Sequence, residues 1–152
     1  MSKTIKKNIK KYTLCFDKNF KDVIAFCQNN PKRKAQGTWI HQEIVDVFCS
    51  LHVKGLAHSV ECYEEDILVG GLYGLYLGGV FCGESMFSLK TDASKVALLG
   101  LCEKIQSIGG DFIDCQMPTK HLSSLGAVSV EREDFIEALQ VSLKKGLHVA
   151  LW

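Results

Sequence analysis

The stretch from residue 58 to residue 85 constrains the fold more than any other part of the chain. It reads HSVECYEEDILVGGLYGLYLGGVFCGES, and its apolar runs are separated by Glu64-Glu65-Asp66 and by Gly78-Gly79. Short runs rich in β-branched and aromatic residues, bounded by turn residues, are typical of strands joined as hairpins. The sequence therefore predicts three consecutive strands in an antiparallel meander.

Two segments with helical spacing precede the meander. The first spans residues 17–28 and ends at Asn29-Asn30-Pro31, and the second spans residues 40–53 and ends at Gly55. Both are predicted as amphipathic helices because their apolar residues fall on one face. These faces consist of Phe20, Val23, Ile24 and Cys27 in the first helix and of Ile44, Val47, Phe48 and Leu51 in the second.

A third helix follows the meander, with Ser94 as its predicted cap and an end near Ile108. Its first half is apolar nearly all round, which is typical of a helix packed against a sheet. The other predicted elements are a short buried strand at 111–116, a brief helix from Thr119 to Gly126, a strand at 127–131 and a helix at 133–144.

The order of these elements favours an α+β fold. With 152 residues the chain is expected to form a single domain, 1–152, with one core. Helices and a mostly antiparallel sheet in one domain fit a mixed sheet flanked by helices better than a doubly wound parallel fold. The strand–helix–strand segment at 80–116 can form one parallel crossover, as in N-acetyltransferase-like (GNAT) folds.

The charge of the chain is unevenly distributed. Ten of its 18 Lys and Arg residues lie within residues 1–34, which contain only two of the 17 acidic residues. Such a basic front is typical of chains that bind a polyanion, and equally of solvated lysine-rich arms. The lysines of the basic N-terminal segment 1–11 are Lys3, Lys6, Lys7, Lys10 and Lys11.

The seven cysteines include no C-x-x-C pair, and most lie in apolar segments such as VFCSL and GLCEKI. Free cysteine serves there as a small hydrophobic residue, so neither a disulfide framework nor a zinc site is expected. This usage indicates a reducing compartment, the cytoplasm. No membrane helix is expected because no run of 18 apolar residues occurs, and MSKTIKKNIKKYTL lacks the apolar core of a secretory signal.

Three polar residues stand out in segments that otherwise belong to the core. Glu84 interrupts the apolar run VFCGESMFS, and burying an unpaired carboxylate is unfavourable. Asp114 and Gln116 lie two apart in the strand predicted at 111–116, which would place both on one face. These residues indicate either a polar pocket or a turn that Asp114 caps, with Gln116 at the surface.

Common catalytic signatures are absent from the sequence. It contains no P-loop, no G-x-G-x-x-G, no G-x-S-x-G and no H-E-x-x-H. The segment LKTDASK before the third helix lacks the glycine-rich turn that binds pyrophosphate in acetyltransferases, so acetyl-CoA is not the expected donor.

Several short motifs, taken together and in order, closely resemble the leucyl/phenylalanyl-tRNA–protein transferase family. FCGESMFS and IDCQ are specific in combination, and the match runs from about residue 12 to residue 143. The motifs are GTWI (37–40), AHSVE (57–61), LVGGLYG (68–74), FCGESMFS (81–88), ASK-x-ALL (93–99), IDCQ (113–116) and HLSSLGA (121–127).

The resemblance implies a GNAT-like aminoacyltransferase. Members of the family transfer Leu or Phe, and less well Met, from aminoacyl-tRNA to proteins with an N-terminal Arg or Lys. The product carries a destabilising N-terminus that the bacterial N-degron pathway recognises. The implied partners are Leu-tRNA or Phe-tRNA and the acceptor protein, with no cofactor, metal or membrane.

The resemblance also implies site residues. Asp114 and Gln116 would receive the incoming amine, with Asp114 polarising Gln116 or relaying its proton, and Glu84 would hold a group of the donor or acceptor. His58 is expected to make a structural hydrogen bond. Carried over from the family, the apolar side-chain pocket falls on Leu72, Phe81, Met86, Leu98, Leu101, Ile105 and Ile113, and Trp39 would lie near the aminoacyl-adenosine.

Longer family members carry an extra N-terminal domain, and this chain is expected to lack it. The lysines of segment 1–11 would then contact tRNA phosphates in its place. Leu101 stands where an aromatic residue is frequent in the family, which would shift the preference between Leu and Phe. Two alternatives stay open: an N-acyltransferase with another small donor, and an inactive member that binds aminoacyl-tRNA or protein N-termini.

Overall fold

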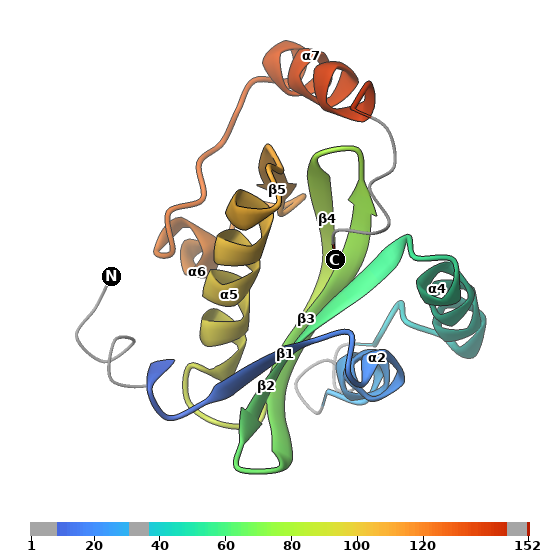
Figure 1. Cartoon of the computed structure of the whole chain (residues 1–152), viewed down its shortest axis with the longest axis vertical. Helices are drawn as coiled ribbons and strands as arrows, with labels where there is room; N and C mark the ends of the chain where they lie inside the picture. The colour runs from blue at the N-terminus through green and yellow to red at the C-terminus, as the bar shows by residue number, and fades with distance from the viewer. Residues whose placement is uncertain (1–8, 31–36, 146–151) are drawn as a thin grey trace.

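The computed structural model describes residues 9–30, 37–145 and 152, and its core is a five-stranded sheet in the order β1-β2-β3-β4-β5 (Figure 1). The strands are β1 (Thr13–Phe16), β2 (Ala57–Glu64), β3 (Ile67–Leu77), β4 (Val80–Ser88) and β5 (Phe112–Asp114). The helices are α2 (Phe20–Gln28), α4 (Gln42–Val53), α5 (Ala93–Ser107), α6 (Lys120–Ser123) and α7 (Arg132–Leu143).

The predicted meander is confirmed. β2 pairs antiparallel with β3, and β3 pairs antiparallel with β4. β4 pairs in parallel with β5, so α5 forms the predicted crossover between them. The sequence did not predict β1, a short edge strand that pairs antiparallel with β2. The fold is therefore α+β, with a mixed, mostly antiparallel sheet.

Helices cover both faces of the sheet, as Figure 1 shows, with α5 on one face and α2 and α4 on the other. Alternate side chains of each strand point to opposite faces, so the sheet contributes to two cores. The α5 core includes Leu72 and Phe81, whereas Tyr73 and Phe87 belong to the α2–α4 core. The sequence predicted the buried face of α2 correctly.

The second predicted helix exists as α4, but its predicted buried face is partly wrong. Val45 is buried, whereas Val47 is 54% exposed. Helical spacing allows either valine to lie beside Phe48 on the buried face, so tertiary packing determines which of the two is buried. Phe48 lies edge-on against Tyr73, with 5.1 Å between ring centroids, and this contact turns Val45 toward the sheet.

The helix α5 begins two residues earlier than predicted. Asp92 is its cap residue and Ser94 lies inside the helix, so the prediction of Ser94 as the cap is wrong. Ala93 packs where a side chain on Gly70 would lie, 2.6 Å from the position of such a Cβ atom. This close approach holds the first turn of α5 against β3.

The chain after α5 is less regular than predicted. The strand at 111–116 shortens to β5, whose residues are only partly buried, and Thr119 caps the brief helix α6 as expected. Residues 127–131 form no strand, and Val128 is 81% exposed. That segment does not pair with β5 in the described sheet, so its alternating valines are exposed to solvent.

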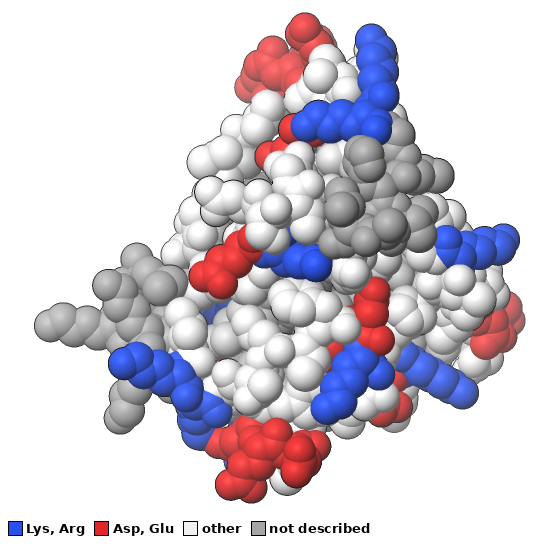
Figure 2. All heavy atoms as spheres, in the orientation of Figure 1, with Lys and Arg blue, Asp and Glu red and all other residues white. Residues whose placement is uncertain are grey.

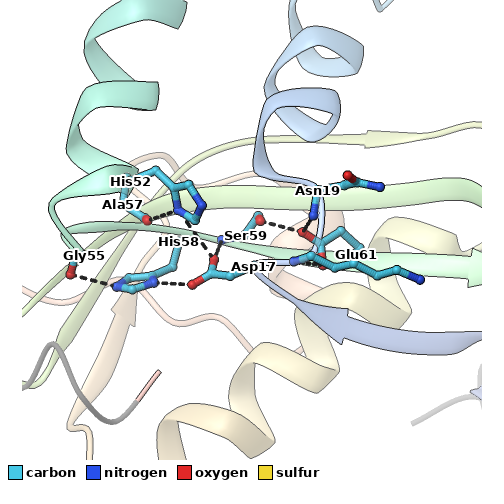
Figure 3. A network of polar contacts seen from close by, with 9 residues as sticks. Asp17, Asn19, His52, Gly55, Ala57, His58, Ser59 and Glu61 are labelled. Atoms are coloured by element: carbon cyan, nitrogen blue, oxygen red, sulfur yellow. Dashed lines mark hydrogen bonds and ion pairs between the residues drawn. The ribbon is translucent and has the colours of Figure 1, made fainter.

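A polar network ties β1 and the start of α2 to β2 (Figure 3). Asp17 Oδ2 lies 2.7 Å from His58 Nδ1, and Asp17 Oδ1 accepts the backbone N–H of Ser59 at 2.8 Å. Glu61 is fully buried and accepts bonds from the Ser59 hydroxyl and from two backbone N–H groups. Burial raises the pKa of Glu61, against the effect of these donors. The structural hydrogen bond expected of His58 is confirmed.

Candidate functional site

A cavity of about 450 Å³ opens beside the sheet, between α5 and the chain that follows β5. Its walls come from β3, β4, α5 and α6 and from the loop that carries Trp39. Among the predicted site residues, those that line it are Trp39, Leu72, Phe81, Glu84, Met86, Leu98, Leu101, Ile113 and Gln116. We call this space the Glu84 cavity. Ile105 and Asp114 do not line it.

One wall of the Glu84 cavity is apolar. Leu72 lies opposite Met86 in the β3–β4 ladder, and Phe81 lies opposite Ile113 in the β4–β5 ladder. Leu98 and Leu101 come from one face of α5, because residues three apart are neighbours on a helix. This wall suits a flexible or branched apolar side chain.

The polar side of the cavity is formed by a β-bulge. Tyr73 pairs with Ser85 and Gly74 pairs with Gly83, so Glu84 is left without a partner on β3. Such a bulge changes the direction in which a side chain points, and here it directs the Glu84 side chain to the cavity. Burial raises the pKa of the Glu84 carboxyl, and the hydrogen bond from Gln116 acts in the opposite direction.

Gln116 faces Glu84 across the cavity. Its side-chain Nε2 donates to Glu84 Oε1 over 3.4 Å, which is a long hydrogen bond. The backbone of Gln116 has φ of +62°, a left-handed conformation at the point where β5 has ended. This turn swings the amide toward β4.

Asp114 supports that turn from outside the cavity. Its Oδ1 accepts the backbone N–H of Gln116 at 2.8 Å. Of the two alternatives indicated by the sequence, the turn capped by Asp114 is therefore the one that describes the contact of this residue. Asp114 and Gln116 do not lie on one face of a strand. The carboxylate contacts the main chain of Gln116, and the side-chain amide contacts Glu84.

Trp39 lies at the edge of the cavity and is 48% exposed. The neighbouring Ile40 is fully buried, and its N–H donates to Thr38 Oγ1 at 3.2 Å. The buried Ile40 thus anchors the loop and leaves the indole free to meet a planar ligand.

Ile105 belongs to an adjoining cavity of about 370 Å³. That space lies under the C-terminal half of α5 and shares Leu98 and Ile113 with the Glu84 cavity. Ile105 is 4% exposed and packs in the α5 core. It therefore supports the apolar wall from behind.

The site also contains residues that sequence reasoning missed. Met117, Thr119 and His121 line the Glu84 cavity from the segment after β5. The signal that could have identified His121 is its place in the motif HLSSLGA, which contributed to the resemblance without being assigned a role.

The expected tRNA-binding lysines are only partly described. Lys3, Lys6 and Lys7 lie outside the described residues, and Lys10 is exposed. Lys11 forms an ion pair of 2.5 Å with Glu64, which raises the pKa of the lysine. On the face shown in Figure 2, basic and acidic side chains of the described residues lie among uncharged ones, both at the rim and toward the middle.

No group of His, Cys, Asp and Glu within the described ranges could hold a metal ion. Within the same ranges, no helix is long and apolar enough to cross a membrane. None of the seven cysteines, all of which lie in the described ranges, forms a disulfide.

Solved structures with a similar fold are acetyltransferases. An acetyltransferase of Clostridium acetobutylicum, crystallised with acetyl-CoA, superposes with a TM-score of 0.57 at 10% identity, over 80% of this chain and 91% of its own. A ribosomal-protein-alanine N-acetyltransferase from Brucella melitensis gives 0.55 at 12% identity, over 79% of this chain and 93% of its own. At such low identity the likeness shows the fold alone, which is that of the GNAT acetyltransferases.

Sequence relatives are closer. Proteins named leucyl/phenylalanyl-tRNA–protein transferase from Sulfurimonas denitrificans and Legionella pneumophila are 49% and 48% identical, over 91% and 95% of this chain. The chain spans 61% and 65% of the length of these two relatives. The family model described as leucyl/phenylalanyl-tRNA protein transferase matches residues 1–140. The chain therefore belongs to the leucyl/phenylalanyl-tRNA–protein transferase family.

Proposed function

We propose that this protein transfers Leu or Phe from aminoacyl-tRNA to the α-amine of proteins that begin with Arg or Lys. Met is a poorer donor residue, and the product is an N-terminus that marks the acceptor for N-degron proteolysis in the cytoplasm. Membership of the family supports this activity. The observation that carries it is the Glu84 cavity, where an apolar wall lies beside a carboxylate and an amide.

The donor side chain would occupy the apolar wall. Leu72, Phe81 and Leu101 are each at most 3% exposed, so their positions are fixed by packing. Met86 completes the wall with a flexible thioether, which adapts to either a branched or an aromatic side chain. Trp39, at the edge, would stack on the terminal adenine of the tRNA.

Glu84 would hold a cationic group next to the ester. Its carboxylate is oriented by Gln116 and partly removed from water, which strengthens its attraction to an ammonium or guanidinium group. This charge would select acceptors that begin with Arg or Lys. The arrangement also holds the α-amine within reach of the ester carbonyl.

The reaction needs little chemical assistance. The α-ammonium loses a proton, and the amine attacks the ester carbonyl to form a tetrahedral oxyanion. The nitrogen then loses its second proton, the C–O ester bond breaks to leave the amide, and the departing ribose oxygen takes up a proton, so that one proton is released overall. An aminoacyl ester is already activated, so positioning and hydrogen bonds to the oxyanion can supply most of the acceleration.

The start of α5 favours a tRNA ester over a coenzyme A thioester. Acetyltransferases bind pyrophosphate through free backbone N–H groups at a helix N-terminus. Here the cap residue is Asp92, whose carboxylate lies 2.6 Å from Lys95 Nζ. This ion pair neutralises the Lys95 ammonium, which would otherwise attract a pyrophosphate.

The proposed function is tested by following label transfer. Purified protein is mixed at low salt with labelled Leu-tRNA or Phe-tRNA and with a model protein that begins with Arg or Lys. We expect transfer to these acceptors and none to the same protein beginning with Ala. An acetyl-CoA arm tests the alternative donor, and one of the longer relatives provides the positive control.

The outcomes separate the alternatives. Transfer of acetyl groups without aminoacyl transfer would identify another N-acyltransferase. Retained binding of aminoacyl-tRNA without transfer would identify a binding protein. Loss of both, beside an active longer relative, would overturn the proposal.

The basic N-terminal segment 1–11 provides a second check on the tRNA partner. If its lysines neutralise phosphates, the logarithm of the binding constant should fall with the logarithm of salt concentration by roughly 0.7 to 0.9 per phosphate contact. Replacing Lys3, Lys6 and Lys7 by Gln should reduce that slope. An affinity that does not change with salt would exclude phosphate contacts.

A further inference from the structure

The side chain of His121 is a partly buried group in the wall of the Glu84 cavity to which no function has been assigned. It is the second residue of α6. Within the described part of the chain, its ring nitrogens make no hydrogen bond or ion pair. The other partly or fully buried histidines differ: His52 contacts the carbonyl oxygen of Ala57 at 2.8 Å, and His58 contacts Asp17 and Gly55.

The position of His121 is set by its neighbours. Thr119 Oγ1 accepts the backbone N–H of Leu122 at 3.1 Å and so caps the helix. The Leu122 carbonyl accepts the N–H of Ala127, and the Leu122 side chain packs against the α5 core. Both Thr119 and Leu122 line the Glu84 cavity, so the short helix holds its His121 face against that space.

The other polar groups of the cavity are less suited to take up a proton. The Gln116 amide is not a base at neutral pH, and Glu84 accepts a bond from that amide. Asp114 lies outside the cavity and accepts the N–H of Gln116. Burial raises the pKa of the Cys115 thiol, so this residue stays protonated. An imidazole is the side chain most often used as a general base at neutral pH.

We propose that His121 takes the proton that the incoming α-ammonium must lose. This inference rests on the proposed function and adds a residue to its site. The neutral imidazole accepts the proton from nitrogen, and the free amine attacks the ester carbonyl. The nitrogen of the tetrahedral intermediate loses its second proton to water. When the intermediate collapses, the C–O ester bond breaks and the imidazolium gives its proton to the departing ribose oxygen, so His121 ends the cycle neutral and one proton is released to solvent.

The variants H121A and H121Q test the proposal, with H41A as the matched control. His41 is exposed, is the N-cap residue of α4, and does not line the cavity. We expect H121A to lower kcat by about 100-fold, the lower range of general-base effects, while KM for both substrates stays within about threefold. H121Q keeps the size and a hydrogen-bond donor of the side chain but not its basicity, so it should be as slow as H121A. H41A should match the wild type.

Two further measurements distinguish proton uptake from a structural role. Free imidazole added to H121A should restore transfer by at least about tenfold, as expected for replacement of a general base. The decline of kcat in acid, present in the wild type, should shift or vanish in H121A. The ionisable groups that could contribute to this decline are Glu84 on β4, Tyr73 on β3, Asp114 and Cys115 at the end of β5, and Lys120 beside His121.

E84Q therefore serves as a second pH control, because a decline that survives E84Q and disappears in H121A belongs to the imidazole. Transfer by H121A within about threefold of the wild type, or recovery in H121Q, would overturn the proposal. In either case an active wild type would leave the proposed function intact. A wild type without transfer would refute both together.

Discussion

Glu84 shows how a single extra residue can create a functional group at the edge of a core. Its neighbours in VFCGESMFS alternate between the faces of β4, and a regular strand would place Glu84 in that alternation. The bulge opposite Tyr73 and Gly74 removes it from the ladder. The sequence indicated an unusual carboxylate, but a bulge depends on pairing with a distant strand and could not be predicted locally.

The raised pKa of Glu84 leads to a prediction about stability. An acid whose pKa is raised in the folded state is unfavourable when ionised, and this penalty is absent below its ordinary value of about 4.5. The variant E84Q keeps the bond from Gln116 and removes the charge. We expect its melting temperature to exceed that of the wild type at pH 7 and to equal it near pH 4, while label transfer falls.

Thermal melts across this pH range, with E103Q as the control, provide the measurement. Glu103 is an exposed carboxylate on α5 that does not line the cavity. An E84Q melting temperature below that of the wild type at pH 7 would show that ionised Glu84 stabilises the fold.

Asp114 is predicted to act through the backbone of Gln116. The Oδ1 atom that accepts this N–H is retained in D114N and lost in D114A. We therefore expect D114N to keep transfer within about threefold of the wild type and D114A to lose about tenfold or more, because a turn that positions a site residue relaxes. Initial rates of label transfer compare the two. If D114N is as slow as D114A, the carboxylate charge itself is required and the relay expected from the resemblance gains support.

At the scale of elements, periodicity predicted what depends on local pattern. The helices α2 and α5 and the three meander strands follow from their apolar spacing and turn residues. β1 was missed because four residues give too short a pattern, and it is held by pairing with residues 60–63 of β2. The strand expected at 127–131 does not form, because alternation alone provides no ladder partner.

The same distinction between local pattern and tertiary packing applies to the residues of the site. Residues of the apolar wall were recognised because their motifs resemble a family, and the structure brings most of them to one cavity. The left-handed turn at Gln116 and the approach of His121 depend on how α6 packs under α5, so they could be seen only in three dimensions.

The helix α7 stands apart from the sheet in Figure 1 and is joined to it near its C-terminal end. Ser142 is 1% exposed, donates to Asp111 Oδ2 at 2.6 Å and accepts the N–H of Gly79 at 3.1 Å. Lys145 pairs with Asp111 at 2.5 Å, and this contact, with the Ser142 hydroxyl, lowers the pKa of the aspartate. A buried hydroxyl thus holds α7 to the β3–β4 turn.

The variant S142A should detach that end of the helix. We expect a loss of about 1 to 2 kcal/mol in the free energy of unfolding, because the buried N–H of Gly79 loses its acceptor and Asp111 loses a donor. Amide exchange of residues 132–143 should accelerate more than that of the meander. S129A, at an exposed position of the preceding loop, is the control. Equal exchange of α7 in S142A and the wild type would contradict the anchoring role.

At the scale of the whole molecule, an aromatic cluster connects the β1–β2 polar network with the Glu84 cavity. The Trp152 ring stacks on His58 at 4.4 Å and on Phe81 at 5.3 Å between centroids. Phe81 lines the cavity, and His58 belongs to the network that fixes β1. The indole therefore supports the outer side of a cavity wall whose inner side is proposed to meet the donor.

The two tryptophans of the chain should separate stability from function. We expect W152A to reduce the free energy of unfolding by about 2 to 3 kcal/mol, less than for a fully buried tryptophan because the residue is only partly buried. W39A should change it by less than about 0.5 kcal/mol, because a half-exposed loop residue loses few contacts. Transfer should follow the opposite order, since Trp39 lies at the edge of the cavity and Trp152 acts only through Phe81.

Denaturant titrations and label transfer at a temperature where both variants are folded measure the two quantities. Normal transfer by W39A would show that the Trp39 indole does not belong to the proposed donor site. Normal stability of W152A would show that the aromatic cluster does not support the cavity wall. W152F, which keeps an aromatic face toward Phe81, should recover most of the lost stability.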